Sequence, residues 1–148
     1  MSGTWDATIL SAYAAEAGEP FAVDAVRNGE KFDVVANVRI GRNLMQFVDH
    51  CELFVSVRNL SRSTTTAHQH QQYTLAPQKL ALNEAFRMQF ASGWTAGEGD
   101  VLEVLATFKV TSGINYDYSM VASGPFIVQG PSPTAAVQPC EPSTDSRT

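Results

Sequence analysis

The sequence predicts a mainly β protein, folded as an antiparallel sandwich of two sheets with seven to eight strands. Apolar residues recur at every second position in several long segments, which is the period of a half-buried strand. Residues typical of turns separate these segments at spacings of roughly 8–20 residues, as in all-β domains. No helical segments alternate with the strands, so parallel crossovers are not expected. The chain of 148 residues has the length of one domain.

The four clearest strands each have one apolar and one polar side. They lie in the stretches "EKFDVVANVRIG", "HCELFVSVRNL", "EAFRMQFA" and "DVLEVLATFKV". We expect the apolar sides of all four to face a common core. The inward-facing sets are Phe32, Val34, Ala36, Val38 and Ile40; Cys51, Leu53, Val55 and Val57; Phe86, Met88 and Phe90; and Leu102, Val104, Ala106, Phe108 and Val110.

Further strands are expected at residues 66–75, in "YDYSMVA" and in "GPFIVQ". The stretch "EPFAVDAV" precedes Asn28-Gly29, a dipeptide that tolerates positive φ and suits a type I′ turn. We therefore predict a hairpin between this stretch and the strand that begins near residue 32. Shorter turns are expected at residues 41–43, 92–99 and 112–115, where Gly, Asn and Ser gather.

The N-terminal segment fits two structures. In "DATILSAYAAEAGEP", Asp6 suits a helix N-cap, Gly18 suits the residue after a helix, and Pro20 suits a stop. The stretch "TWDATIL" equally suits a first strand with Trp5 and Ile9 inward. We expect a strand that runs into a short helical turn.

The chain divides into a sandwich domain over residues 1–129 and a tail over residues 130–148. The tail is rich in Pro, Ser and Thr and contains almost no large apolar residues. It cannot bury enough surface to offset the entropy lost on ordering, so we predict that it is disordered.

The strand pattern over roughly residues 18–129 resembles an immunoglobulin-like sandwich. "NGEKFDVVANV" is similar to the turn and second strand of such domains, and "GEGDVLEVLATFKV" to the approach to their sixth strand. The inter-sheet cysteine pair and the core tryptophan of antibody domains are absent, and Leu102 or Val104 stands where a corner tyrosine would lie. The resemblance implies a fold and no particular activity.

Composition excludes several function classes. The net charge of −5 argues against a nucleic-acid binder, which would carry a basic face. No segment approaches the ~20 apolar residues of a membrane span. The N-terminus has no basic region followed by an apolar run, so no signal peptide is expected and a cytoplasmic location is predicted. No Gly-rich phosphate loop precedes a helix, and we expect no cofactor.

Covalent catalysis is not favoured either. The sequence has no Gly-x-Ser-x-Gly elbow. His50 and Cys51 are neighbours on a strand and therefore point to opposite faces, so they cannot form a nucleophile–base pair. We interpret Cys51 as a small core residue, and Cys140 lies in the tail. An enzyme is therefore the less favoured reading.

Two stretches have the residue types of metal sites. His68 and His70 share one strand face, and His50 with Glu52 could complete a set of four ligands. The apolar residues Tyr73 and Leu75 lie on the opposite face of that strand, which indicates that this face is the core side. Both histidines are then exposed to water. We therefore predict no metal at His50, His68 and His70.

The second stretch, "GEGDVLE", places three carboxylates near one turn, but it lacks the ligand density of a calcium loop. We interpret it as a solvated turn followed by an outward Glu103. The three acidic residues are Glu98, Asp100 and Glu103.

The remaining feature is a set of apolar residues on outward positions. Phe54, Val101 and Leu105 lie on the outward sides of two strands that are neighbours in an immunoglobulin-like topology. We predict that they form an interface with a protein partner or a second copy, giving a homo-oligomer. The alternative function is a small enzyme or carrier with an apolar pocket. Its predicted lining is Trp94, Tyr116, Tyr118 and Met120.

Overall fold

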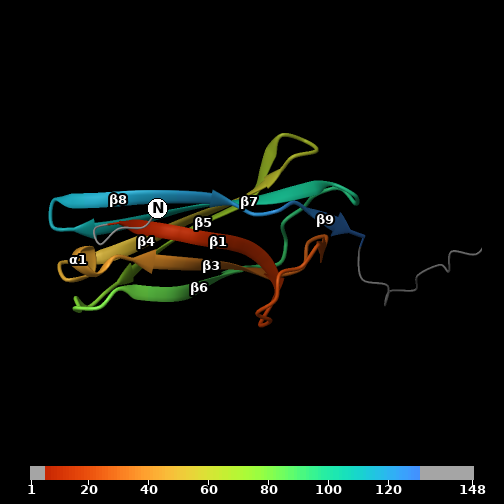
Figure 1. Cartoon of the computed structure of the whole chain (residues 1–148). Helices are drawn as coiled ribbons and strands as arrows, with labels where there is room; N and C mark the ends of the chain where they lie inside the picture. Colours follow the sequence, from red (N-terminus) through yellow and green to blue (C-terminus); the bar gives the residue numbers. More distant parts are fainter. Residues whose placement is uncertain (1–5, 131–148) are drawn as a thin grey trace, which may run out of the picture.

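The structure is a computed structural model that describes residues 6–130. Over these residues the chain forms nine strands and one short helix (Figure 1). The fold is therefore mainly β, as predicted. The elements are β1 (Ala7–Glu16), β2 (Ala25–Arg27), β3 (Phe32–Ile40), α1 (Arg42–Met45), β4 (His50–Asn59), β5 (Thr64–Thr74), β6 (Leu82–Phe90), β7 (Val101–Ser112), β8 (Asn115–Ala122) and β9 (Phe126–Gln129).

The strands form two sheets. One sheet has the order β1-β3-β6, and the other has the order β2-β9-β7-β4-β5, with β8 also paired to β7. One edge of β7 pairs with β4. The other edge pairs with β8 along most of its length and with β9 near Val101, so that Leu105 is opposite Ala122 and Val101 is opposite Ile127. We predicted that both sheets are antiparallel. The larger sheet is instead mixed, because β2 pairs with β9 in parallel.

The core lies between the two sheets. Burial alternates residue by residue along β4 and β7, and the buried residues are the predicted inward sets together with Asn59 and Ser112 at the strand ends. Leu53 and Phe108 lie opposite each other on these strands and are fully buried. On β6 the inward residues Met88 and Phe90 are buried and Phe86 is partly buried.

The predicted helical turn near the N-terminus is wrong. Residues 7–16 form a single strand, paired with β3 from Ala7 opposite Ile40 to Glu16 opposite Phe32. The register shifts between Ile9 and Ser11, so the inward positions change from odd to even numbers along the strand. This shift breaks the period of two and makes the alanine-rich second half look helical in the sequence. Trp5 lies outside the described residues.

The predicted hairpin at Asn28-Gly29 is also wrong. The N–H of Glu30 donates to the carbonyl of Arg27 at 3.1 Å, so a turn forms there. Only Gly29 has positive φ, whereas a type I′ turn needs positive φ at both central residues. The turn therefore carries the chain from β2 in the larger sheet to β3 in the smaller sheet, and the two strands do not pair.

Other connections differ less from expectation. The turn predicted at residues 41–43 is the start of α1, while a tight turn with Gly113 at positive φ joins β7 to β8. The predicted tail lies outside the described residues, apart from Gly130. Within residues 6–130, no helix is long and apolar enough to cross a membrane.

A buried charge pair fixes the outer side of the smaller sheet. Asp33, which is 1% exposed, accepts hydrogen bonds from the guanidinium of Arg87 and from the N–H of Gly18 at 3.0 Å. Arg87 also donates to the carbonyl of Glu19. These contacts hold the loop after β1 across the sheet, which the polar position of Asp33 in the sequence did not reveal.

Side chains join the two sheets at β1 and β8. The N–H of Ala7 donates to Asp117 at 2.8 Å, and the N–H of Ile9 donates to the hydroxyl of Ser119 at 3.0 Å. These backbone donors face away from β3, so the side chains of β8 satisfy the free edge of β1.

Candidate functional site

The outward side chains of β5, β4, β7 and β8 form one continuous surface, which we call the outer face. Residues directly opposite each other in antiparallel strands point to the same side of a sheet. Phe54 is opposite His70 on one side and Thr107 on the other, and Thr107 is opposite Met120. This row crosses four strands near their middle.

Most residues that the sequence selected for separate reasons lie together on the outer face. The candidate interface residues, the three histidines and three of the four candidate pocket residues all point this way. Leu105 is opposite Ser56, two positions from Phe54, and is therefore the diagonal neighbour of Phe54. The set comprises His50, Phe54, His68, His70, Val101, Leu105, Tyr116, Tyr118 and Met120.

Val101 and Trp94 depart from this arrangement. Val101 is at the far end of β7, opposite Ile127, so it is four positions from Leu105. Trp94 is buried, its indole N–H donates to the carbonyl of Glu30 at 2.7 Å, and its ring packs edge-on against Phe32. Trp94 therefore belongs to the core and does not share a pocket with the residues of β8.

The centre of the outer face holds a stacked pair. The rings of Phe54 and His70 are parallel within 3°, with centroids 4.3 Å apart. The imidazole Nε2 of His70 lies 3.2 Å from a carboxylate oxygen of Glu52. His70 thus covers much of the apolar ring beside it and presents a polar edge to Glu52.

The polar contacts continue onto β7 and β8. The second carboxylate oxygen of Glu52 lies 3.8 Å from the ammonium of Lys109. That ammonium is 5.0 Å from the ring centroid of Tyr116 and 5.5 Å from that of Tyr118, within cation–π range. The two tyrosine rings meet edge to face at 5.5 Å. Long side chains that would otherwise move freely are therefore held in fixed positions on this surface.

The exposed apolar area of the outer face is concentrated on β8. Tyr116, Tyr118 and Met120 are 60%, 55% and 70% exposed, whereas Phe54 and Leu105 are half-buried. A shallow hollow of about 370 Å³ lies here, lined by Thr107, Tyr118, Ser119 and Met120. The apolar surface predicted around Phe54 and Leu105 thus extends one strand further.

A sequence signal for this extension exists. The turn between β7 and β8 leaves Ser112 opposite Asn115, and this tight hairpin sets Thr107 opposite Met120. A hairpin assumed at the predicted turn of residues 112–115 would have joined Met120 to the surface around Phe54.

The histidines do not gather around one point. The Nδ1 of His68 is 2.9 Å from the hydroxyl of Ser56, and His70 contacts Glu52. His50 is opposite Thr74 and Thr111. Within the part of the chain that the structure describes, no three His, Cys, Asp or Glu residues lie close enough to hold a metal ion.

Cys51 is a core residue, as predicted. Its side chain is fully buried, and His50 points to the outer face. Burial, with a smaller contribution from the charge of Glu52, raises the pKa of the Cys51 thiol to about 12. The thiol therefore stays protonated at neutral pH, and it is not a nucleophile there.

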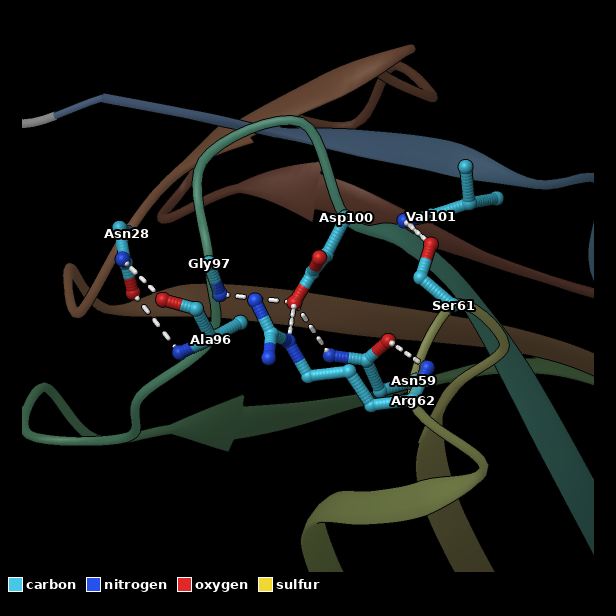
Figure 2. Close-up of polar contacts among 8 residues, drawn as sticks. All are labelled: Asn28, Asn59, Ser61, Arg62, Ala96, Gly97, Asp100 and Val101. Atoms are coloured by element: carbon cyan, nitrogen blue, oxygen red, sulfur yellow. Dashed lines mark hydrogen bonds and ion pairs between the residues drawn. The ribbon is translucent and has the colours of Figure 1, made fainter.

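The turn that contains Asp100 is a second polar cluster, and it is not the solvated turn that we predicted. Asp100 is 7% exposed. One of its oxygens accepts hydrogen bonds from Asn59 at 2.8 Å, Arg62 at 2.7 Å and the N–H of Gly97 at 2.7 Å (Figure 2). Asn59 also accepts from the N–H of Arg62. The cluster joins the loop before β7 to the turn after β4. Because Asn59, Arg62 and Gly97 all donate to Asp100, we interpret the cluster as structural.

The stability contribution of Asp100 is expected to depend on pH. Hydrogen bonds from Asn59, then Arg62 and Gly97, lower the pKa of Asp100 from 3.8 to about 2. A lowered pKa stabilises the folded state above the unfolded value, and this stabilisation is lost as the pH falls from 3.8 towards 2. Urea unfolding across this interval should show a steeper loss in the parent than in Asp100→Asn. Parallel curves for the two proteins would contradict the assignment.

The outward side of the smaller sheet differs from the outer face. Its positions are mostly polar or small, and the loop after β1 covers one end of it. They are Thr8, Ser11, Tyr13, Ala15, Asp33, Val35, Asn37, Arg39, Asn83, Ala85, Arg87 and Gln89, together with the exposed Leu10 at the bulge of β1. The outer face is therefore the more apolar of the two broad surfaces of the sandwich.

Comparison of the sequence with protein-family models and with curated proteins found no match.

Proposed function

We propose that the protein is a non-enzymatic interaction module that binds a second copy of itself through the outer face. The observation that carries this proposal is the row from His70 through Phe54 and Thr107 to Met120, which places the exposed Met120 and the half-buried Phe54 beside the polar contacts of Glu52 and Lys109. Interfaces combine an apolar centre with a polar rim in this way. Tyr and Met are among the residues enriched in such centres.

The size of the outer face supports a contact of this kind. Four strands at ~4.8 Å spacing and eight residue steps at ~3.3 Å give a footprint of about 19 by 26 Å. Two such faces would cover roughly 1,000 Å² together, which is the lower limit for a specific interface. Lys109 and Glu52 lie on the same face, so a twofold contact can set opposite charges against each other.

The proposal includes an immunoglobulin-like sandwich as the scaffold. Its support is the strand order: β4 and β7 are central neighbours in one sheet, while β1, β3 and β6 form the other. This order matches the placement of the third and sixth strands against the first, second and fifth strands in such domains. β8 and β9 together take the place of the last strand.

A second function is favoured by the hollow on the outer face. Its lining by Thr107, Tyr118 and Met120 would suit a small apolar ligand, as in a carrier. A ligand in this position would occupy the same surface as a second copy, so the two functions would compete.

The double substitution Leu105→Lys/Met120→Lys tests the proposal. Both side chains point outward, so the fold should persist while four added charges oppose each other across the contact. We expect sedimentation equilibrium to give a lower mass than for the parent, with an unchanged circular dichroism spectrum. The matched control is Asn83→Lys/Gln89→Lys, which adds the same charge to the outward side of the smaller sheet.

A folded Leu105→Lys/Met120→Lys variant with the mass of the parent would contradict the proposal. An equal loss of mass in the control would show that the added charge, and not the position, causes dissociation.

A further inference from the structure

The outer edge of β5 is a row of free backbone groups. Among residues 6–130, β5 is the last strand of its sheet and pairs only with β4. The N–H of Leu75, just after β5, donates to the carbonyl of Asp49, just before β4, at 3.3 Å. Backbone groups alternate between the two sides of a strand. The N–H and C=O groups of every second residue from Gln72 back to His68 therefore face away from β4.

This edge has a bulge at Thr66, one of the features that protect edges, but it lacks the others. Edge strands are usually guarded by charged residues, Pro or a covering element. The eleven residues "TTTAHQHQQYT" of β5 include no Lys, Arg, Asp, Glu or Pro. By contrast, the edge strand β6 carries Glu84 and Arg87.

Neighbouring elements leave the β5 backbone accessible. The ring of Tyr73 stacks on Phe86 of β6 at 4.3 Å, and the amide of Gln69 donates to the carbonyl of Gln89. Both contacts use inward side chains of β5 and not its outward backbone groups. The hairpin that joins β4 to β5 also stands clear of the sandwich in Figure 1.

We propose that β5 pairs antiparallel with β5 of a second copy across a twofold axis, so that the larger sheet continues from one copy into the other. An antiparallel pairing of two identical edges is isologous, so both copies contribute the same backbone groups. With the axis at Gln69, His68 of one copy lies opposite His70 of the other, and the regular pairing ends at Thr66, where β5 has a bulge, opposite Gln72. The residues whose backbone groups face the other copy are then all Thr, His or Gln, and the side chain of each can donate and accept hydrogen bonds. No formally charged carboxylate or ammonium meets another, although the whole chain carries a net charge of −5.

This contact is independent of the outer face, because it uses backbone groups at the edge of the sheet. Both outer faces of the paired copies lie on the same side, so the pairing doubles that surface. Two such pairs could then meet face to face in an assembly of four copies.

Gln72→Pro tests the edge contact in the full chain. The N–H of Gln72 faces away from β4, so proline removes an outward donor and leaves the pairing with β4 intact. We expect sedimentation equilibrium to give half the mass of the parent, with the circular dichroism spectrum unchanged. Gln72→Ala keeps the N–H and should keep the mass of the parent. A folded Gln72→Pro variant with the parental mass, or a monomeric parent, overturns the proposal.

A measurement on the unmodified chain covers the case in which Gln72→Pro does not fold. The amide protons of His68, His70 and Gln72 should exchange with solvent more slowly in concentrated than in dilute protein. Equal exchange rates overturn the edge contact. The variant Leu105→Lys/Met120→Lys separates the two proposals, because it leaves β5 unchanged. If it alone lowers the mass, only the face contact exists, and if Gln72→Pro alone does so, only the edge contact exists.

Discussion

Phe108→Ala is expected to lower the free energy of unfolding by about 3–5 kcal/mol, the usual cost of removing a buried phenyl ring. Phe108 is fully buried on β7, opposite Leu53, and its ring also lies 6.4 Å from that of Phe86 on the smaller sheet. The substitution therefore opens a cavity between the two sheets. Urea unfolding followed by circular dichroism measures the change.

Phe54→Ala is the matched control, because Phe54 lies on the neighbouring strand and faces outward. Its loss leaves no internal cavity, so we expect a cost of about 1 kcal/mol from the lost stacking with His70. If Phe108→Ala unfolds the protein entirely, Phe108→Leu should give a smaller loss that is still measurable. Equal costs for Phe108→Ala and Phe54→Ala would show that the inner and outer faces are wrongly assigned.

Asp33→Ala is expected to cost about 2 kcal/mol, because it removes a buried carboxylate that accepts a hydrogen bond from the half-buried Arg87 guanidinium. The N–H of Gly18 also loses its acceptor. Thermal unfolding should show a large decrease in the melting temperature.

Two variants make this prediction specific. Asp33→Asn keeps an oxygen for Gly18 and should cost less than Asp33→Ala. Asp24→Ala removes an exposed carboxylate and should change the free energy of unfolding by less than about 0.5 kcal/mol. A cost for Asp33→Ala as small as that for Asp24→Ala would contradict the buried pair.

The strands with a clean period of two were predictable from the sequence, and β3, β4, β6 and β7 have the inward sets expected of them. The errors lie where a local signal had competing meanings. The bulge near Leu10 hides the strand period of β1, and tertiary pairing with β3 outweighs the helix propensity of its alanines. Asn28-Gly29 forms a turn, but β2 does not pair with the strand that follows it. Its partner is β9, about a hundred residues later in the chain.

The residues of the outer face were predictable one strand at a time, and the short turn at residues 112–115 also predicts the register of β8 on β7. The register of β5 on β4 was not predictable, because the alternation does not reveal the bulge at Thr66. Trp94 was predicted to line a pocket but is buried in the core, because an aromatic residue in a Gly-rich loop gives no sign of packing there. Likewise, the acidic loop gave no sign that Asp100 would be buried by Asn59 and Arg62.

The most direct test of the outer face as a contact surface is hydroxyl-radical footprinting of the unmodified protein in dilute and concentrated solution. Met120 and Tyr118 are exposed on the outer face, and Phe21, which is 73% exposed, lies in the loop after β1. We predict that oxidation of Met120 and Tyr118 falls with rising protein concentration while oxidation of Phe21 stays constant. The outer face is not the surface through which the copies meet if the extent of oxidation of each residue is the same at both concentrations. The same conclusion follows if Phe21 alone is protected.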